Sequence, residues 1–146
     1  MRAYLYALTV FLGVVLTVHL AMNATVGAVI GNPRVGNAVF WTIGAIMAIV
    51  IGLTGWEAGA LSRLSVVNPL LLTAGAMGAS LVFGIAWVIP QIGAGPMTLC
   101  LLLGQIVSGL VISNYGLLGS PVQSLSVTNI IGAVVMFVGV LLATRG

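Results

Sequence analysis

Two polar side chains, His19 and Asn23, lie one helical turn apart in a long apolar stretch near the start of the chain. Residues four apart share a helix face, so this spacing places an imidazole beside a carboxamide. Ionisable groups inside membrane spans are rare and tend to face a cavity or a partner. The pair predicts a ligand contact or a protonation site, with a hydrogen bond from His19 to a neighbouring helix as the alternative.

A third polar group, Gln105, lies in the uncharged stretch 98–113. Its amide both donates and accepts hydrogen bonds, and in hydrocarbon it needs a partner on another helix or on a ligand. At 100° per residue, one arc of a helix through this stretch carries Gly104, Gln105, Ser108, Gly109 and Ser113. We expect this small and polar arc to face protein, with room for a ligand beside Gly109.

The residues predicted to contact a substrate are His19, Asn23, Gln105 and Ser108. For Ser108, the alternative is a hydrogen bond back to its own helix. The site has no fixed negative charge, so a neutral or zwitterionic molecule fits it better than a permanently cationic drug. Glu57, the single acidic residue, follows Trp56 at the end of a predicted span, and we expect it to be solvated near Arg63.

Several function classes find no support in the sequence. It has no phosphate-binding loop, no nucleophile paired with a base and no cluster of metal ligands, so we expect neither an enzyme nor a bound cofactor or metal. Cys100 is the single cysteine, which leaves no disulfide. A net charge of +3 spread over the chain is too sparse for a nucleic-acid partner.

The composition indicates an all-α integral membrane protein. Apolar residues make up 61% of the chain and charged residues 3%, with a mean hydropathy of +1.30, whereas about a quarter of the residues in soluble domains are charged. About 20 apolar residues cross the bilayer as a helix. The apolar runs and turn residues predict a single transmembrane domain over 1–146 with five spans, at 3–30, 37–55, 69–89, 96–113 and 125–144.

Small residues recur at helical spacing within the spans. Such ridges let helix backbones approach closely in lipid. The residues predicted to form them are Gly44, Gly52, Ser80, Gly84, Gly104, Gly109, Gly132 and Gly139.

The arginines give no preferred orientation across the membrane. With five spans, Arg2 and Arg63 lie on one side and Arg34 and Arg145 on the other. The positive-inside rule counts Lys and Arg in short loops, so the count is two against two. A chain without bias can insert both ways, and two opposed copies would form an antiparallel dimer, a ten-helix assembly like the inverted repeats of larger transporters.

The segments GQIVSGLVISNYGLLG, HLAMNATVGAVIGNP, NPLLLTAGAMGASLVFGIAWVIPQIGAG and TNIIGAVVMFVGVLLA resemble the YdcZ-like five-helix branch of the drug/metabolite transporter superfamily. The resemblance covers nearly the whole chain and rests on glycine-rich membrane patterns. It departs where the family usually has Asp-His-Phe, because this chain has Ser113, Asn114 and Tyr115. It implies a multi-pass protein of the bacterial inner membrane.

The features together predict a small-molecule transporter that works by alternating access as an antiparallel dimer. Its partners would be the lipid bilayer, a second copy and a small-molecule substrate. Two alternatives are a passive channel of dual topology and a membrane subunit that is active only with a homologous partner chain. The scattered polar positions favour the transporter over a pore, and the absence of a charge bias disfavours the partner-dependent subunit.

Overall fold

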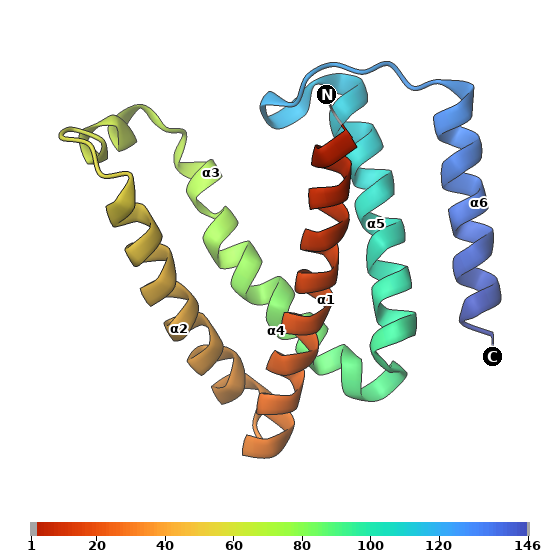
Figure 1. Ribbon diagram of the computed structural model, residues 1–146, viewed down its shortest axis with the longest axis horizontal. Helices are drawn as coiled ribbons and strands as arrows, with labels where there is room; N and C mark the ends of the chain where they lie inside the picture. Colours follow the sequence, from red (N-terminus) through yellow and green to blue (C-terminus); the bar gives the residue numbers. More distant parts are fainter. Residues whose placement is uncertain (1–2, 146) are drawn as a thin grey trace. The chain divides into compact units, whose positions relative to one another are not determined.

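The computed structural model describes residues 3–145, which fold into helices joined by short turns and loops, with no strand among them (Figure 1). Arg2, which enters the predicted charge count, lies outside these residues. The elements are α1 (Ala3–Ile30), α2 (Pro33–Thr54), η1 (Leu61–Val66), α3 (Pro69–Leu72), α4 (Ala74–Ile92), α5 (Ala94–Tyr115), η2 (Leu117–Gly119) and α6 (Val127–Ala143). The predicted all-helical class is confirmed.

Four segments of the described chain are long and apolar enough to cross a membrane: Tyr4–Ile30, Pro33–Thr54, Pro69–Ile92 and Ala94–Tyr115. The fifth apolar helix, α6, has 17 residues, which is the lower limit for a span at about 1.5 Å rise per residue. The molecule is therefore an integral membrane protein, and the assembly of two copies stays a prediction.

The second helix begins at Pro33, four residues before the predicted start at 37. Asn32 caps it, because the Asn32 Oδ1 atom accepts hydrogen bonds from the backbone N–H groups of Arg34 and Val35 at 3.1 and 3.4 Å. Proline suits the first helical position, where its missing N–H has no intrahelical partner. Asn32 and Pro33 thus start a helix as well as ending the preceding one.

The third span was expected to end at 89, but α4 continues through Pro90 to Ile92. A proline removes one intrahelical hydrogen bond and crowds the carbonyl group four residues earlier, but here the helix continues for two residues past Pro90. The helix stops where Gly93 takes a φ of 84°. The segment is also interrupted at Thr73, which separates α3 from α4.

The fourth and fifth helices also differ from their predicted bounds. α5 runs over 94–115 instead of 96–113 and ends on Gly116, which adopts a left-handed conformation with φ 62°. This is a common way to satisfy the last carbonyl groups of a helix. α6 starts at Val127, two residues after the predicted start at 125, because Ser126 caps it: the Ser126 hydroxyl accepts from the Asn129 N–H at 3.1 Å.

The described chain divides into two compact units, one ending at Gln91 and one beginning at Ile92. In the first unit, α1 and α2 meet at their shared turn, where a Cβ atom on Gly36 would lie 2.7 Å from the Gly27 Cα atom. The two helices diverge from there (Figure 1). In the second unit, α5 packs against α6. The prediction of one domain over 1–146 stays a prediction.

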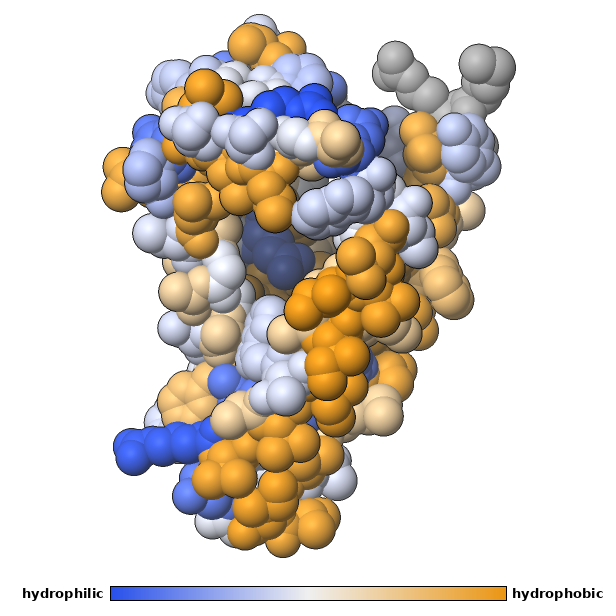
Figure 2. Space-filling model, turned by 90° about the vertical axis from the view of Figure 1, so that its left-hand side faces the viewer, coloured by the Kyte–Doolittle hydropathy of each residue, from blue (hydrophilic) through white to orange (hydrophobic). Residues whose placement is uncertain are grey.

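The diverging parts of α1 and α2 have little cover from the chain itself. Every residue from Tyr4 to Leu16 and from Thr42 to Thr54 is exposed. Figure 2 shows apolar side chains gathered in a band on the face that it presents. The exposed apolar side chains of α2 include Ile43, Ile46 and Ile49. Lipid or another protein must cover these apolar surfaces in the membrane.

Candidate functional site

A pocket of about 170 Å³ lies between α1 and α2. Its polar side chains are the predicted pair, His19 and Asn23, both from α1. The remaining walls are apolar or aromatic: Met22 and Val26 from α1, and Val39, Phe40 and Ile43 from α2. A small polar group inside apolar walls is the usual composition of a ligand site, although this volume is below that of most drug-sized pockets.

Asn23 is the most deeply buried polar residue of the described chain, with 2% of its surface exposed. Its Nδ2 atom donates to Asn37 Oδ1 over a long 3.5 Å, and Asn37 Nδ2 in turn donates to the Ala79 carbonyl oxygen at 3.3 Å. These amides link α1 to α2 and α2 to α4. Asn23 Oδ1 is buried with no hydrogen-bond partner.

An unpartnered buried acceptor is costly. Leaving such an atom without a hydrogen bond costs about 1–3 kcal/mol, and most buried polar atoms in proteins are paired with protein or water. Asn23 Oδ1 lacks a donor among residues 3–145.

His19 is half-buried, and its Nδ1 atom lies 2.7 Å from the carbonyl oxygen of Leu16 in the same helix. Its ring also packs near Phe40 of α2, with the ring centres 5.3 Å apart. The hydrogen bond thus runs within α1, and the bond to a neighbouring helix that was the alternative is not formed. One ring nitrogen, Nε2, remains free for another contact.

Gln105 and Ser108 lie on α5, in the second unit. The Ser108 hydroxyl donates to the Gly104 carbonyl oxygen at 2.8 Å, as its alternative role predicts. Gln105 is exposed, as are Ser108 and Gly109, whereas Ile106 on the other arc is half-buried. Gln105, Ser108 and Gly109 on this arc are thus exposed, and their contact with a second copy or a substrate stays a prediction.

The second unit contains its own pocket of about 300 Å³ beside Gly109. Its polar lining comes from the end of α5, the α5–α6 connection and the start of α6. The lining residues are Ile106, Gly109, Leu110, Ser113, Gln123, Ser124, Leu125 and Asn129. The connection is held to α5 by hydrogen bonds from Gln123 N to Ser113 O at 2.9 Å and from Leu125 N to Asn114 Oδ1 at 3.0 Å.

The glycines predicted for helix packing have no close neighbour within the described chain. A Cβ atom would meet nothing within 4 Å at Gly44, Gly52, Gly84, Gly104, Gly109, Gly132 or Gly139. The hydroxyl of Ser80, the other predicted position, donates to the Ala76 carbonyl oxygen at 2.9 Å. Their role in packing stays a prediction.

A close contact of Gly27 with Gly36 lies between α1 and α2, and sequence reasoning missed it. Both residues are buried on either side of the turn at Asn32 and Pro33. Their position next to the predicted turn could have indicated this contact, because two helices joined by a short turn lie closest together beside that turn. The glycines predicted for packing repeat within one helix, whereas this contact joins two helices.

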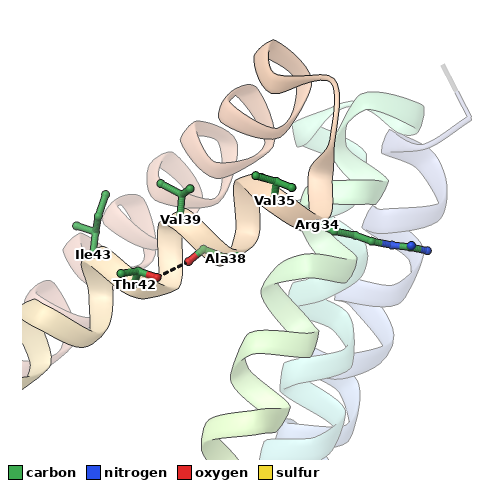
Figure 3. A pocket seen from close by; sticks show the side chains of 6 residues that line it. All are labelled: Arg34, Val35, Ala38, Val39, Thr42 and Ile43. Carbon is green, nitrogen blue, oxygen red and sulfur yellow. Dashed lines mark hydrogen bonds between the residues drawn. The ribbon is translucent and has the colours of Figure 1, made fainter.

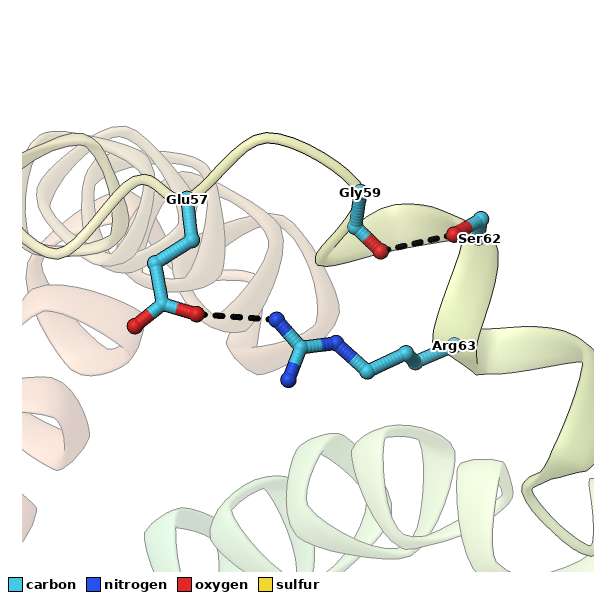
Figure 4. A network of polar contacts seen from close by, with 4 residues as sticks. All are labelled: Glu57, Gly59, Ser62 and Arg63. Atoms are coloured by element: carbon cyan, nitrogen blue, oxygen red, sulfur yellow. Dashed lines mark hydrogen bonds and ion pairs between the residues drawn. The ribbon is translucent and has the colours of Figure 1, made fainter.

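Glu57 forms an ion pair with Arg63 outside the helical spans, with Glu57 Oε2 2.8 Å from an Arg63 guanidinium nitrogen (Figure 4). The two side chains are 71% and 66% exposed. The prediction of a solvated Glu57 near Arg63 is confirmed. Among residues 3–145, no three His, Cys, Asp or Glu side chains come together as metal ligands.

A shallow hollow on α2 is a weaker candidate. Its walls are Arg34, Val35, Ala38, Val39, Thr42 and Ile43, all from one helix. Arg34 extends away from the apolar side chains, and the Thr42 hydroxyl donates to the Ala38 carbonyl oxygen at 2.9 Å (Figure 3). The Thr42 hydroxyl proton is already used within α2, and every lining residue comes from that one helix. The hollow therefore offers few groups that could hold a ligand.

Comparison with known proteins gives one match. The family model described as "Putative inner membrane exporter, YdcZ" matches residues 4–142. The searches of curated proteins and of solved structures found no significant match. The match confirms the resemblance seen in the sequence and the location as a multi-pass inner-membrane protein.

Proposed function

Because the chain belongs to the YdcZ family of inner membrane exporters, we propose that it transports a neutral or zwitterionic small molecule by alternating access as an antiparallel dimer. A membrane transporter is the class to which the family points. The substrate, the mechanism and the dimer are the proposal. The observation that carries it is Asn23, a buried amide whose Oδ1 atom has no partner and which lines a pocket within a membrane span.

The dimer is supported by the surface of the chain. The second half of α2 and the first half of α1 are exposed apolar helices, and the predicted glycine ridges have space around them. Small residues are common where membrane helices meet. The balance of two arginines against two supports opposed copies.

In this proposal His19 and Asn23 contact the substrate from α1. Gln105 and Ser108 contribute from α5, where Gln105 is exposed. The pocket of about 170 Å³ is one part of the site, and rocking of the two copies exposes the complete site to each side of the membrane in turn.

Transport assays with purified protein in liposomes test the activity. A panel of neutral and zwitterionic metabolites is loaded, and their release is measured. We expect the Gln105→Leu and His19→Leu variants to slow release of a transported compound while helix content is retained. Normal transport by both variants would show that the site lies elsewhere. Release that ignores substrate identity and never saturates would favour the passive channel instead.

Cysteine labelling tests dual insertion. In a Cys100→Ser background, Ser62→Cys and Thr144→Cys lie in segments predicted on opposite sides of the membrane. An impermeant thiol reagent should label each site from both faces of the cell membrane. Labelling of each site from one face alone would contradict the homodimer and favour a homologous partner chain.

A further inference from the structure

We infer that the connection between the second and third spans, residues 55–68, lies in the headgroup layer of the bilayer with its apolar side chains against the acyl chains. The flanking segments Pro33–Thr54 and Pro69–Ile92 are both long and apolar enough to cross a membrane, so both ends of the 55–68 connection are held at the membrane surface. The lipid contact of the connection thus continues that of the two spans. It does not depend on the proposed transport.

The apolar side chains of the 55–68 connection are not covered by the chain. Leu61 and Leu64 are 60% and 49% exposed, and Val66 is 85% exposed. Trp56, just after the end of α2, is exposed as well. Apolar surface gains free energy when it leaves water, and an exposed apolar patch marks a contact with a membrane or a protein. Tryptophan is also the residue that is enriched at the membrane surface.

The polar side chains of the connection are bonded within it. Glu57 Oε2 lies 2.8 Å from an Arg63 guanidinium nitrogen, and the Ser62 hydroxyl donates to the Gly59 carbonyl oxygen at 2.7 Å (Figure 4). The Ser65 hydroxyl donates to the Ser62 carbonyl oxygen at 2.8 Å. Polar groups that are already hydrogen-bonded lose less when part of their water is withdrawn. Paired polar groups and open apolar side chains suit the membrane surface better than bulk water.

The short helix η1 separates the two kinds of side chain. In a 3₁₀-helix, residues three apart lie on the same edge. The edges of η1 are one of leucines, one of serines and one mixed: Leu61 with Leu64, Ser62 with Ser65, and Arg63 with Val66. A helix that lies flat in the headgroup layer turns a polar side to water and an apolar side to the acyl chains. On the mixed edge, the long side chain of Arg63 carries its charge up to the headgroups.

The connection has no net charge to draw it to acidic lipids. Glu57 and Arg63 are its charged residues, and they balance each other. Attraction to an anionic membrane surface requires an excess of Lys and Arg. The contact therefore depends on apolar surface, and we expect it to be the same on zwitterionic and on anionic bilayers.

Spin labels test where each edge lies. In a Cys100→Ser background, the Leu64→Cys, Ser65→Cys and Val66→Cys variants each carry one nitroxide on the full chain in phosphatidylcholine bicelles, where both bilayer faces are open to reagents. Oxygen collects among the acyl chains, and a nickel chelate stays in water. We expect collisions with oxygen to prevail at positions 64 and 66, and collisions with the chelate to prevail at 65. Adding phosphatidylglycerol should leave these preferences unchanged.

Glutamine substitutions test whether the leucine edge holds the connection in place. With the label at Val66, the double variant Leu61→Gln and Leu64→Gln should lose the preference for oxygen, because its apolar edge is gone. The matched double variant Ser62→Gln and Ser65→Gln adds the same polar groups to the serine edge and should keep that preference. If the first double variant does not fold, the difference between labels at Leu64 and Ser65 still decides the inference.

Two results would overturn the inference. Collisions with the nickel chelate at every labelled position would place the connection in bulk water. Weak collisions with both reagents would show that protein, such as a second copy of the chain, covers the connection in place of lipid. Neither result would contradict the proposed transport, which the liposome assays test separately.

Discussion

Gly36 has little room for a side chain. A Cβ atom there would lie 2.7 Å from Gly27 Cα and 2.9 Å from Gly27 N, and these backbone atoms cannot move aside as a flexible side chain can. The contact also determines how closely α1 and α2 approach below the pocket. The geometry of the site therefore depends on Gly27 and Gly36 having no side chains.

We predict that Gly36→Ala lowers the free energy of unfolding by about 1–3 kcal/mol, the usual cost of forcing extra volume into a packed contact. Detergent-dependent unfolding followed by circular dichroism measures this change. Gly13→Ala on α1 is the matched control, since a Cβ atom there meets nothing within 4 Å. Equal losses from both variants would show that the α1–α2 contact is not formed as described.

Glu57 tests whether a carboxylate takes part in transport. Its pairing with Arg63 is exposed to solvent, and such pairs contribute about 0–1 kcal/mol. We predict that Glu57→Gln leaves the stability within about 1 kcal/mol of the unmodified chain and leaves the transport rate unchanged. Arg63→Gln, the other half of the pair, should behave in the same way. A large loss of transport by Glu57→Gln alone would make Glu57 a coupling group.

At the scale of elements, α6 depends on its first turn. It is the shortest of the five apolar segments, with 17 residues. Ser126 and Asn129 satisfy backbone N–H groups reciprocally, since the Ser126 hydroxyl accepts from Asn129 N and Asn129 Oδ1 accepts from Ser126 N at 3.0 Å. This capping box sets the start of the helix at Val127.

We predict that Ser126→Ala destabilises α6 by about 1 kcal/mol, the typical cost of losing an N-cap side chain. Hydrogen exchange of the backbone amide of Asn129 should quicken about fivefold, because RT is ~0.6 kcal/mol. Ser126→Thr keeps the hydroxyl and should retain most of the protection. Exchange that is unchanged in Ser126→Ala would mean that packing against α5, and not the cap, holds this turn.

At the scale of the whole molecule, the small residues of the spans are predicted to contact a second copy of the chain. Gly109 is exposed on α5 with nothing within 4 Å of its Cβ position. A Cβ atom there meets no neighbour among the described residues. A loss of assembly with unchanged helix content would therefore point to a contact outside the chain.

We predict that Gly109→Leu reduces the dimer fraction in detergent while circular dichroism shows unchanged helix content, because small residues permit the close approach of helices. Light scattering combined with size-exclusion chromatography measures this fraction. Leu110→Val, the neighbouring position on the opposite arc, should leave the dimer intact. If both variants dimerise as the unmodified chain does, this arc faces lipid.

The sequence by itself determined the helical membrane class, the family and the polar pair on α1. These depend on apolar length, turn residues and spacing, which are local properties of the chain. Helix ends were less accurate, since α2 begins at Pro33 and α4 passes through Pro90. At these positions the capping groups set where the helix begins or ends. A proline can lie inside the helix or outside it, so it does not mark the boundary.

Only the tertiary structure decided which surfaces meet and which polar atoms are left free. Surfaces that face lipid and surfaces that face protein are both apolar in a membrane, so composition does not separate the open ridges from the contact of Gly27 with Gly36. The free acceptor on Asn23 depends on Asn37 and on a carbonyl group of Ala79, 42 residues further along than Asn37. Such a hydrogen-bond chain exists only when three helices are brought together.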